Sequence, residues 1–483
     1  MQRIIALALI FVTMAWGQAW ATQYYVRTDG NDGNTGLVDS AGGAWASMGH
    51  AVATMVAGDT TTVGDGTYTE TDFRFNANGT EASPITLQAA HEHLAILSST
   101  SGCDANIEIN ASYIVTDGIR TQIDAGNTPC GGHNSTDGNG IRCFPGNVPD
   151  AGTPDTVNHH IIIRNTMHDA STERSYSINC AGDYSIIEGN IAANGIQGGA
   201  SHDIIIRDNV VTGASAFGEG MVVSKFGSKN PQAYNNHVTC TTAFESCLML
   251  GGNSSDGNHY DEVTDIECYN CIAYNNVITS SVTGSQVDVG FVGCKDCLFA
   301  FNTIVASTAV LRNVAGGGTA APLPENPTWK NNTITASGAC TADFTDFTGT
   351  QTVDYNNFYT CTSPPTQAHA IAGNPKLRAD FIGATMRHER GHFARALYEG
   401  IAFSIRDLLQ AARGLGLSFS VARLLGGGAR SATWRQIIAD VTGLSVERPA
   451  NGDASFGAAL VASPGRQMGV SGLRREPARV VLG

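Results

Sequence analysis

Short apolar runs recur along most of the chain, and most of them end in asparagine. Clear examples are residues 161–165 (IIIRN), 186–190 (IIEGN) and 204–209 (IIIRDN). Further members of the series are residues 234–236, 274–276, 301–302, 330–332 and 355–357. Most of the spacings are roughly 20–30 residues, a repeat length that is typical of one coil of a solenoid. The pattern predicts a parallel stack of short β-strands.

Two of these repeats superimpose when Cys268 is aligned with Cys294, namely CYNCIAYNNVITS from Cys268 and CKDCLFAFNTIVAS from Cys294. Equivalent positions on adjacent coils of a parallel solenoid lie about 4.8 Å apart. A buried asparagine can then satisfy its amide by bonding to the asparagines above and below it. We therefore predict a structural ladder of inward-pointing asparagines, which includes Asn165, Asn190, Asn209, Asn276 and Asn302.

The two ends of the repeat region have their own patterns. A strand at residues 24–26 and a short helix at residues 51–56 precede the first repeats. After residue 381 the apolar period changes from 2 to 3.6, which predicts a helix over residues 392–415. A strand at residues 419–425, a glycine-rich turn and a helix at residues 434–441 follow. The C-terminal part is therefore predicted to be a small α/β fragment.

Composition and charge divide the chain at the same point. Residues 382–483 carry 13 Arg and 7 acidic residues, a net charge of +6. Because the whole chain has a net charge of -15, residues 1–381 have a net charge of -21. All 12 cysteines lie before the division. The acidic larger part argues against nucleic acid as a partner, because phosphate binding needs a basic surface. The 56 Gly and 15 Pro fit turn-rich β structure.

The N-terminal segment has the order of a secretory signal: Arg3, an apolar run from Ile4 to Trp16, and Ala19-Trp20-Ala21. The run is too short for a permanent membrane span. The predicted organisation is a signal peptide at 1–21, a β-helix at 22–381, an α/β fragment at 382–463 and a disordered tail at 464–483. Localisation outside the cytoplasm, secreted or periplasmic, is the corresponding expectation.

The cysteines allow more than one interpretation. The alignment of the two repeats stacks Cys268 with Cys294 and Cys271 with Cys297. Disulfides are favoured in an exported chain, whereas four thiolates at this spacing could hold zinc, and stacked free thiols are the third alternative. Cys240 with Cys247, and Cys340 with Cys361, are further plausible bridges, although connectivity does not follow from sequence.

The repeats and the N-terminal pattern resemble secreted right-handed parallel β-helix proteins. That resemblance implies binding or cleavage of acidic polysaccharides in a groove on the side of the solenoid, with carboxylates that hold calcium and a Lys or Arg that abstracts a proton. The charged residues that fall in neighbouring coils are Asp183, Glu188, Asp203, Asp208, Glu219 and Lys225. Charged loop residues are more often simply solvated, and no motif here identifies a lyase or a hydrolase.

Three blocks near the C-terminus resemble the C-terminal domain of FGGY carbohydrate kinases of the xylulose kinase type. They are RHERGHFARALYEGIAFSIRDLL, LLGGGARSATWRQIIADVTGLSVERP and ASFGAALVAS. The resemblance implies an actin-like, ribonuclease H-like fold for this fragment. It also implies contact of ATP with Gly426, Gly427, Gly428 and Ala429, with Arg430 and Ser431 beginning the flanking helix. No residue is identified as a magnesium ligand or as catalytic.

The fragment is predicted to lack phosphoryl transfer. Kinases of this family need a first lobe with an Asp-x-Gly-Thr phosphate loop and a catalytic aspartate, and residues 1–381 contain no such block. Asp65-Gly66-Thr67 only mimics it. The favoured interpretation is an exported, glycan-contacting β-helix fused to an inert kinase fragment. A functional sugar kinase and a polysaccharide lyase are the alternatives.

Overall fold

The computed structural model describes the parts of the chain in which the repeats and the C-terminal helix lie. The described residues are 21–99, 105–123, 139–143, 158–169, 176–213, 219–240, 246–252, 266–280, 286–316, 322–337, 340–360, 366–369, 371, 395, 398–399, 401–403, 405–406, 409, 413, 419–424, 429 and 431–448. The chain divides into two compact units, residues Met1–Pro375 and Lys376–Gly483, and each is described by itself. The predicted signal peptide, apart from Ala21, and the predicted tail lie outside the described residues.

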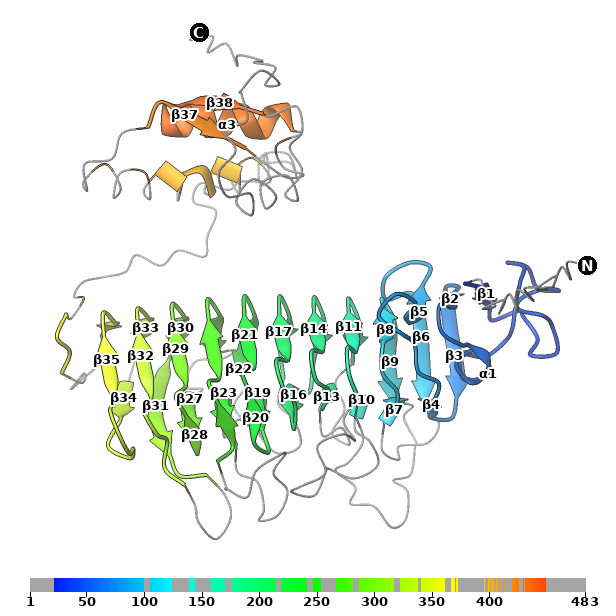
Figure 1. Cartoon of the computed structure of the whole chain (residues 1–483), viewed down its shortest axis with the longest axis horizontal. Coiled ribbons are helices and arrows are strands. Elements are labelled where there is room, and N and C mark those ends of the chain that lie inside the picture. The colour runs from blue at the N-terminus through cyan, green and yellow to red at the C-terminus, as the bar shows by residue number, and fades with distance from the viewer. Residues whose placement is uncertain are drawn as a thin grey trace, which may run out of the picture. The chain divides into compact units, whose positions relative to one another are not determined.

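The first unit is a right-handed parallel β-helix with three long sheets (Figure 1). Each coil contributes one strand to each sheet, and every strand pairs in parallel with its equivalent one coil away. The 12-stranded sheet contains β1 (Gln23–Val26), β2 (Thr60–Val63), β5 (Ile85–Ala89), β8 (Ile114–Asp117), β11 (Ile162–Arg164), β14 (Ile186–Glu188), β17 (Ile205–Arg207), β21 (Gln232–Tyr234), β25 (Ile272–Tyr274), β29 (Leu298–Ala300), β32 (Thr328–Lys330) and β35 (Thr352–Asp354).

The other two long sheets complete each coil. The 11-stranded sheet contains β3 (Gly66–Glu70), β6 (Ala95–Ser99), β9 (Arg120–Ile123), β12 (Met167–His168), β15 (Ile191–Ala192), β18 (Val210–Val211), β22 (His237–Cys240), β26 (Val277–Ser280), β30 (Thr303–Ala306), β33 (Thr333–Ala336) and β36 (Asn357–Tyr359). The 10-stranded sheet contains β4 (Phe73–Phe75), β7 (Ala105–Ile109), β10 (Asn139–Cys143), β13 (Ile178–Cys180), β16 (Ile196–Gly199), β19 (Glu219–Lys225), β23 (Ser246–Gly251), β27 (Gln286–Val292), β31 (Thr308–Val314) and β34 (Cys340–Asp343). A short sheet of β20 (Ser228–Lys229), β24 (Cys268–Tyr269) and β28 (Cys294–Lys295) precedes three strands of the first sheet.

Alternation along each strand sends one set of side chains inside, as the period of 2 requires. Ile163, Ile187 and Ile206 occupy the same position on successive coils and are fully buried. Aromatic residues fill the last coils, where Trp329 contacts Phe291, Phe299 and Phe344. Stacked apolar rows of this kind form one continuous core along the solenoid.

The internal asparagine ladder is present at the turn between the 12-stranded and 11-stranded sheets. Asn276 Nδ2 donates to Asn302 Oδ1 at 2.9 Å, and Asn276 Oδ1 accepts from Asn236 Nδ2 at 2.9 Å. Equivalent bonds link every neighbour along the ladder, and all of its asparagines are at most 1% exposed. Its members are Asn190, Asn209, Asn236, Asn276, Asn302, Asn332 and Asn356.

The prediction for Asn165 is wrong. Its side chain is only half-buried and donates to Asp117 Oδ1 at 3.0 Å on the outside of the turn. The inner position on this coil belongs to Thr166, whose hydroxyl donates to Asn190 Oδ1 at 2.7 Å. Asn165 instead occupies the outer turn position, which has a positive φ on successive coils and favours Asn, Asp and Gly. Gly189 and Asn235 are its equivalents, at φ 67° and 58°.

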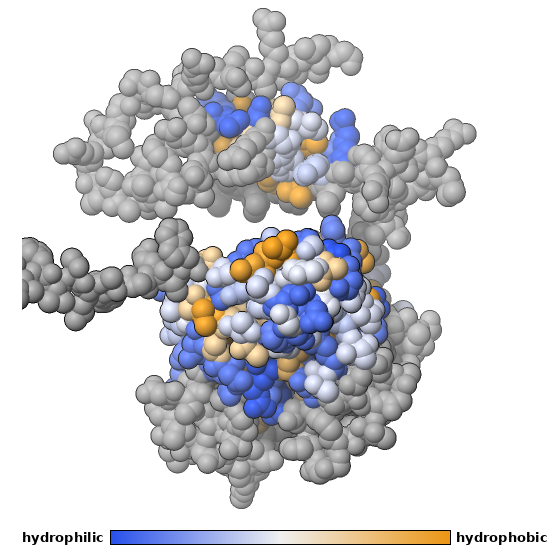
Figure 2. All heavy atoms as spheres, turned by 90° about the vertical axis from the view of Figure 1, so that its right-hand side faces the viewer, coloured by the Kyte–Doolittle hydropathy of each residue, from blue (hydrophilic) through white to orange (hydrophobic). Residues whose placement is uncertain are grey.

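A short cap begins the solenoid. The helix α1 (Met48–Thr54) buries Met48, Ala51 and Val52, and Ser47 caps it by accepting from the N–H of His50. Asp32 accepts from the N–H groups of Ala46 and Ser47. The space-filling view of this end shows a mostly hydrophilic surface with a few small hydrophobic patches (Figure 2). The predicted strand and short helix are therefore both present, with the helix beginning slightly earlier than expected.

The second unit contains a β-α-β arrangement. The strand β37 (Val421–Arg423) pairs in parallel with β38 (Ser445–Glu447), and the helix α3 (Ala432–Thr442) connects them. The residues between 395 and 413 that the structure describes are helical, within the range predicted from the apolar period. A small core joins Ala402 to Ile437, Ile438, Ala439 and Val446. This arrangement agrees with the predicted α/β fragment.

Candidate functional site

The predicted nucleotide turn lies at the start of α3. Ser431 is the N-cap of this helix, and its hydroxyl accepts from the N–H of Trp434 at 3.2 Å. Ala429 is buried, and its carbonyl accepts from Arg435 Nη1 at 2.7 Å. Gly426, Gly427, Gly428 and Arg430 lie outside the described residues. The contact of these six residues with ATP therefore stays a prediction.

The described part of the second unit is small for a catalytic site. A helix N-terminus carries a partial positive charge that favours anions. Phosphoryl transfer also needs metal ligands and a base on the opposite side of the nucleotide. The residues directly before this unit belong to the last coil of the β-helix, in which β35 pairs with β32 and β36 pairs with β33.

The charged candidates whose side chains the structure describes have separate partners, except that Glu188 and Asp208 both lie beside Arg207. Asp203 accepts from Asn230 Nδ2 at 3.2 Å, and Asp208 accepts from Asn235 Nδ2 at 3.1 Å, each in an outer turn. Lys225 Nζ lies over the ring of Phe226, 4.9 Å from its centroid. The side chain of Glu219 lies outside the described residues. Asp203 and Asp208 therefore bond within outer turns, whereas Lys225 contacts an aromatic ring.

Among the charged candidates whose side chains the structure describes, Asp183 is the most buried. Its Oδ1 accepts from the N–H of His202 at 2.6 Å. Its Oδ2 lies 3.6 Å from Nδ1 of His202 and 3.8 Å from Nδ1 of His159. The three residues come from successive coils, so the carboxylate holds neighbouring turns together.

The outer face of the 12-stranded sheet carries a regular column of polar side chains. Arg164 Nε donates to Asp117 Oδ2 at 2.8 Å, and Arg207 Nε donates to Glu188 Oε2 at 2.8 Å. Arg207 Nη1 also donates to the hydroxyl of Tyr234 at 3.1 Å. These bonds, first that to Tyr234 and then that to Glu188, raise the pKa of Arg207. The polar column contains Asp117, Arg164, Glu188, Arg207, Tyr234 and Tyr274, one residue from each of six successive coils.

Two tyrosines end this polar column. The rings of Tyr234 and Tyr274 stack at 4.9 Å between centroids. Burial, followed by the neighbouring Tyr234, raises the pKa of Tyr274, so the hydroxyl of Tyr274 is protonated at neutral pH. Beside the polar column runs an apolar column of half-buried side chains from the same strands, namely Ile162, Ile186, Ile205, Ile272 and Leu298, with Gln232 among them.

Sequence reasoning did not single out this face, although a signal was present. Each member of the polar column from Arg164 to Tyr274 directly follows a buried apolar residue of the same strand, so alternation along the strand places it outside. Its partner one coil away follows from the same register.

The cysteines are paired in part as expected. Cys240 is bonded to Cys247, as predicted, and Cys143 of β10 is bonded to Cys180 of β13, which the sequence analysis did not propose. Cys340 is disulfide-bonded, whereas Cys361 lies outside the described residues.

The bridges expected across the two stacked Cys-x-x-Cys motifs are not the ones formed. Cys268 and Cys294 do pair in register on adjacent strands. The disulfide, however, joins Cys268 to Cys271 of the same coil, with Cα atoms 6.3 Å apart, and leaves Cys294 and Cys297 as buried thiols. Both side chains of one motif point into the coil from either side of a tight turn, so the nearest sulfur can belong to the same motif.

The model of the C-terminal domain of the FGGY family of carbohydrate kinases matches residues 350–464, less than a quarter of the chain. The C-terminal part of this chain resembles FGGY carbohydrate kinases. Its first matched residues, up to Tyr359, nevertheless fold as the last β-helix coil. In-register strand pairing is direct evidence of their position, so the FGGY-like part begins after this coil.

Curated relatives match the same FGGY-like part. Xylulose kinase of Escherichia coli (strain K12) is 35% identical over 91 residues, which cover 18% of this chain and 19% of the relative. Xylulose kinase of Bacillus subtilis (strain 168) is 37% identical over 90 residues, 18% of each chain. L-xylulose/3-keto-L-gulonate kinase of Escherichia coli (strain K12) is 37% identical over 91 residues, 19% of this chain and 18% of the relative. The chain thus spans about a fifth of the length of the curated relatives it matches.

Among solved structures, the alginate lyase from Paenibacillus sp. str. FPU-7 is 16% identical with a TM-score of 0.40, covering 67% of this chain and 95% of that chain. Pectate lyase Pel9A is 12% identical with a TM-score of 0.36, covering 70% and 80%. Similarity at this level transfers neither substrate nor activity to this chain. Among the described residues, no helix has the length and apolar character needed to cross a membrane.

Proposed function

We propose that this chain is an exported β-helix that contacts a neutral glycan, fused to an inert fragment of an FGGY carbohydrate kinase. The observation that carries the first half is the pair of adjacent columns on the 12-stranded sheet. One offers hydroxyl, guanidinium and carboxylate groups, and the other offers apolar side chains. Sugars present hydroxyl groups at their edges and C–H groups on their faces, and both kinds of surface have a partner here.

The repeat of the solenoid favours a linear polymer. Adjacent strands lie about 4.8 Å apart, so a chain that runs along the axis meets the same kind of group at each coil. The net charge of -21 over residues 1–381 repels polyanions, which favours a neutral glycan. The charge and the engagement of Arg164 and Arg207 by carboxylates both argue against a lyase for acidic polysaccharides.

Glycan contact is tested by a double substitution that removes only two hydroxyls, Tyr234→Phe with Tyr274→Phe. The full chain is titrated against a panel of soluble neutral and acidic polysaccharides by affinity electrophoresis. Two lost hydrogen bonds at about 1 kcal/mol each weaken binding by roughly tenfold to a hundredfold. Tyr359→Phe, on β36 of the 11-stranded sheet, is the matched control. Absence of binding by the unaltered chain, or equal binding by both variants, would refute the proposal.

The second half of the proposal concerns the FGGY-like part. Its family resemblance implies contact with ATP from the turn before α3, and in the sequence a β-helix precedes it in place of a first lobe. A one-sided site cannot hold the γ-phosphate in line with a sugar hydroxyl. The purified chain should bind ATP weakly or not at all and should not phosphorylate xylulose above background. Turnover that disappears in Gly427→Asp would establish the alternative, a functional carbohydrate kinase.

Export rests on the signal-like segment that ends at Ala21 and on the disulfides. Cleavage after Ala21 would leave Thr22 as the first residue of the mature chain. N-terminal sequencing of the chain recovered outside the cytoplasm tests this directly. A chain that retains Arg3 and stays in the cytoplasm would contradict export.

A further inference from the structure

Four cysteines of two consecutive coils meet in the interior of the β-helix. Cys268 and Cys271 come from one coil, and Cys294 and Cys297 from the next. Cys268 is the register partner of Cys294, and the carbonyl of Cys271 accepts from the N–H of Leu298 at 2.8 Å. All four side chains are at most 1% exposed. The spacing C-x2-C-x22-C-x2-C thus becomes a single buried cluster of sulfur atoms.

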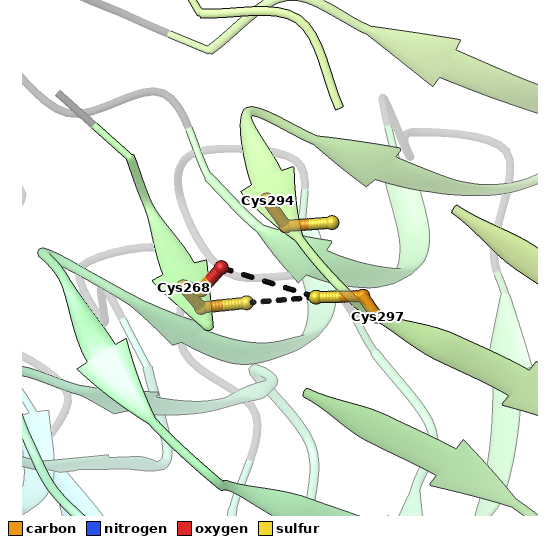
Figure 3. A group of neighbouring side chains, drawn as sticks. All are labelled: Cys268, Cys294 and Cys297. Atoms are coloured by element: carbon orange, nitrogen blue, oxygen red, sulfur yellow. Dashed lines mark hydrogen bonds between the residues drawn. The ribbon is translucent and has the colours of Figure 1, made fainter. Parts of the chain in front are cut away.

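The sulfur atoms lie at the separations of a tetrahedral thiolate site. The Sγ atoms of Cys268, Cys294 and Cys297 are all within 4.8 Å of one another. Cys268 Sγ and Cys297 Sγ are 3.7 Å apart (Figure 3). A zinc ion with Zn–S bonds of about 2.3 Å has its sulfurs about 3.8 Å apart along each tetrahedron edge. Cys271 Sγ is bonded to Cys268 Sγ, and reduction of that disulfide frees it as the fourth sulfur beside these three.

We propose that these four cysteines form a zinc site when the Cys268–Cys271 disulfide is reduced. A dithiol reductant supplies two electrons and two protons to open that disulfide, and is itself oxidised to a disulfide. Four neutral thiols then bind one Zn²⁺ and release four protons. Among the described residues, Cys268, Cys294 and Cys297 are the one group of three or more metal-ligating side chains whose ligand atoms lie close enough for a shared ion.

Without metal, Cys294 and Cys297 are buried thiols. Burial raises the pKa of the Cys294 thiol well above its usual range, and the hydrogen bond with Cys297 adds to this effect. Cys297 Sγ donates to the carbonyl of Lys295 at 3.4 Å.

The burial also determines when the ion can bind. Fully enclosed sulfurs do not meet a metal from solvent in the folded coil, so the ion has to enter while the coils form. We expect the site to fill during refolding and to resist chelators afterwards. The other two described disulfides, Cys143–Cys180 and Cys240–Cys247, offer two sulfurs each and serve as internal controls.

The test uses the full chain, unfolded and reduced with an excess of dithiol, freed of reductant without oxygen, and refolded with Co²⁺ as a spectroscopic probe for zinc. One Co²⁺ per chain, with the visible and charge-transfer absorption of a four-thiolate tetrahedral ion, is the expected result. The Cys294→Ser/Cys297→Ser variant should lose this absorption. The Cys240→Ser/Cys247→Ser variant should keep it.

Folding is checked by the β-sheet circular dichroism of each variant. If the first double variant does not fold, Cys271→Ser alone is used, because a site with three thiolates and an oxygen ligand shifts the Co²⁺ spectrum. A refolded β-helix without bound Co²⁺ would overturn the proposal. Recovery of a Cys294–Cys297 disulfide from the anaerobically refolded chain, with no metal bound, would overturn it as well.

Discussion

Replacing Asn276 by alanine removes one rung of the internal asparagine ladder. The Asn276 side chain donates to the carbonyl of Ala233 at 3.1 Å and to Asn302 Oδ1 at 2.9 Å. Its oxygen accepts from the backbone N–H of Asn236 at 3.0 Å and from Asn236 Nδ2 at 2.9 Å. The substitution therefore breaks four hydrogen bonds at a position that is 0% exposed.

The expected loss in free energy of unfolding depends on which neighbours of Asn276 keep a hydrogen-bond partner after the substitution. Asn236 Nδ2 still donates to the carbonyl of Ile206 at 2.9 Å, and Asn302 Oδ1 still accepts from the backbone N–H of Asn276 at 2.9 Å. The backbone N–H of Asn236 loses its acceptor, and a buried unsatisfied donor costs about 1–3 kcal/mol. The two bonds donated by the lost amide contribute about 1 kcal/mol each. We expect a total loss of about 3–5 kcal/mol.

The assay is urea unfolding of the full chain, followed by the β-sheet circular dichroism. Asn275→Gly is the matched control, because Asn275 lies one residue earlier and its exposed amide donates to Asn235 Oδ1. Its φ of 55° suits glycine without strain. We expect this control to lose less than about 1 kcal/mol. Since solenoids can unfold in steps, the comparison requires equal denaturant dependence in the two variants.

An Asn276→Ala variant that is no less stable than Asn275→Gly would refute the reasoning. The ladder would then be a consequence of the fold and would contribute nothing to its stability.

Three further predictions follow from individual residues. Trp329→Ala should lower the free energy of unfolding by about 3–5 kcal/mol, because it empties the aromatic cluster of the last coils; a loss below about 1 kcal/mol in urea unfolding would contradict this. Burial raises the pKa of Glu70 above 4.5, against the opposing bonds from the N–H groups of Gly49 and Met48, so the folded state holds this proton more tightly than the unfolded state. Stability should therefore fall as the pH rises from about 4.5 through the folded pKa, and the melting temperature of Glu70→Gln should lack this component. Ser431→Ala removes the N-cap of α3 and should cost about 1 kcal/mol, measured as faster hydrogen exchange of its first amides, with unchanged exchange counting against the cap.

The parallel β-helix was predictable because a solenoid converts sequence offset directly into spatial neighbourhood. The constant offset between the two aligned repeats placed Cys268 beside Cys294 and Asn276 beside Asn302, and both pairs are neighbours. Asn165 was misplaced by one position because its coil has Thr166 at the inner site. A shift of one residue moves a side chain from the inside of a strand or turn to the outside.

The candidate sites were harder to predict from the chain alone. The glycine-rich turn before Ser431 was recognised through its neighbouring blocks, since a single such turn is common. The polar column from Asp117 to Tyr274 was missed because its residues differ in type from coil to coil. These residues share one face of the sheet, and recognising that face requires knowledge of the register of six successive strands.

By itself the sequence determined the solenoid, the change of fold in the C-terminal part and the resemblance of that part to FGGY kinases. These properties depend on local periodicity and on contiguous blocks, which the order of residues carries directly. The tertiary structure decided which cysteines form disulfides and which residues bond to Asp183 and Glu188. It also decided which side chains form the outer face of the 12-stranded sheet. Those outcomes depend on turn geometry and side-chain direction, which vary from coil to coil and are fixed when neighbouring coils pack together.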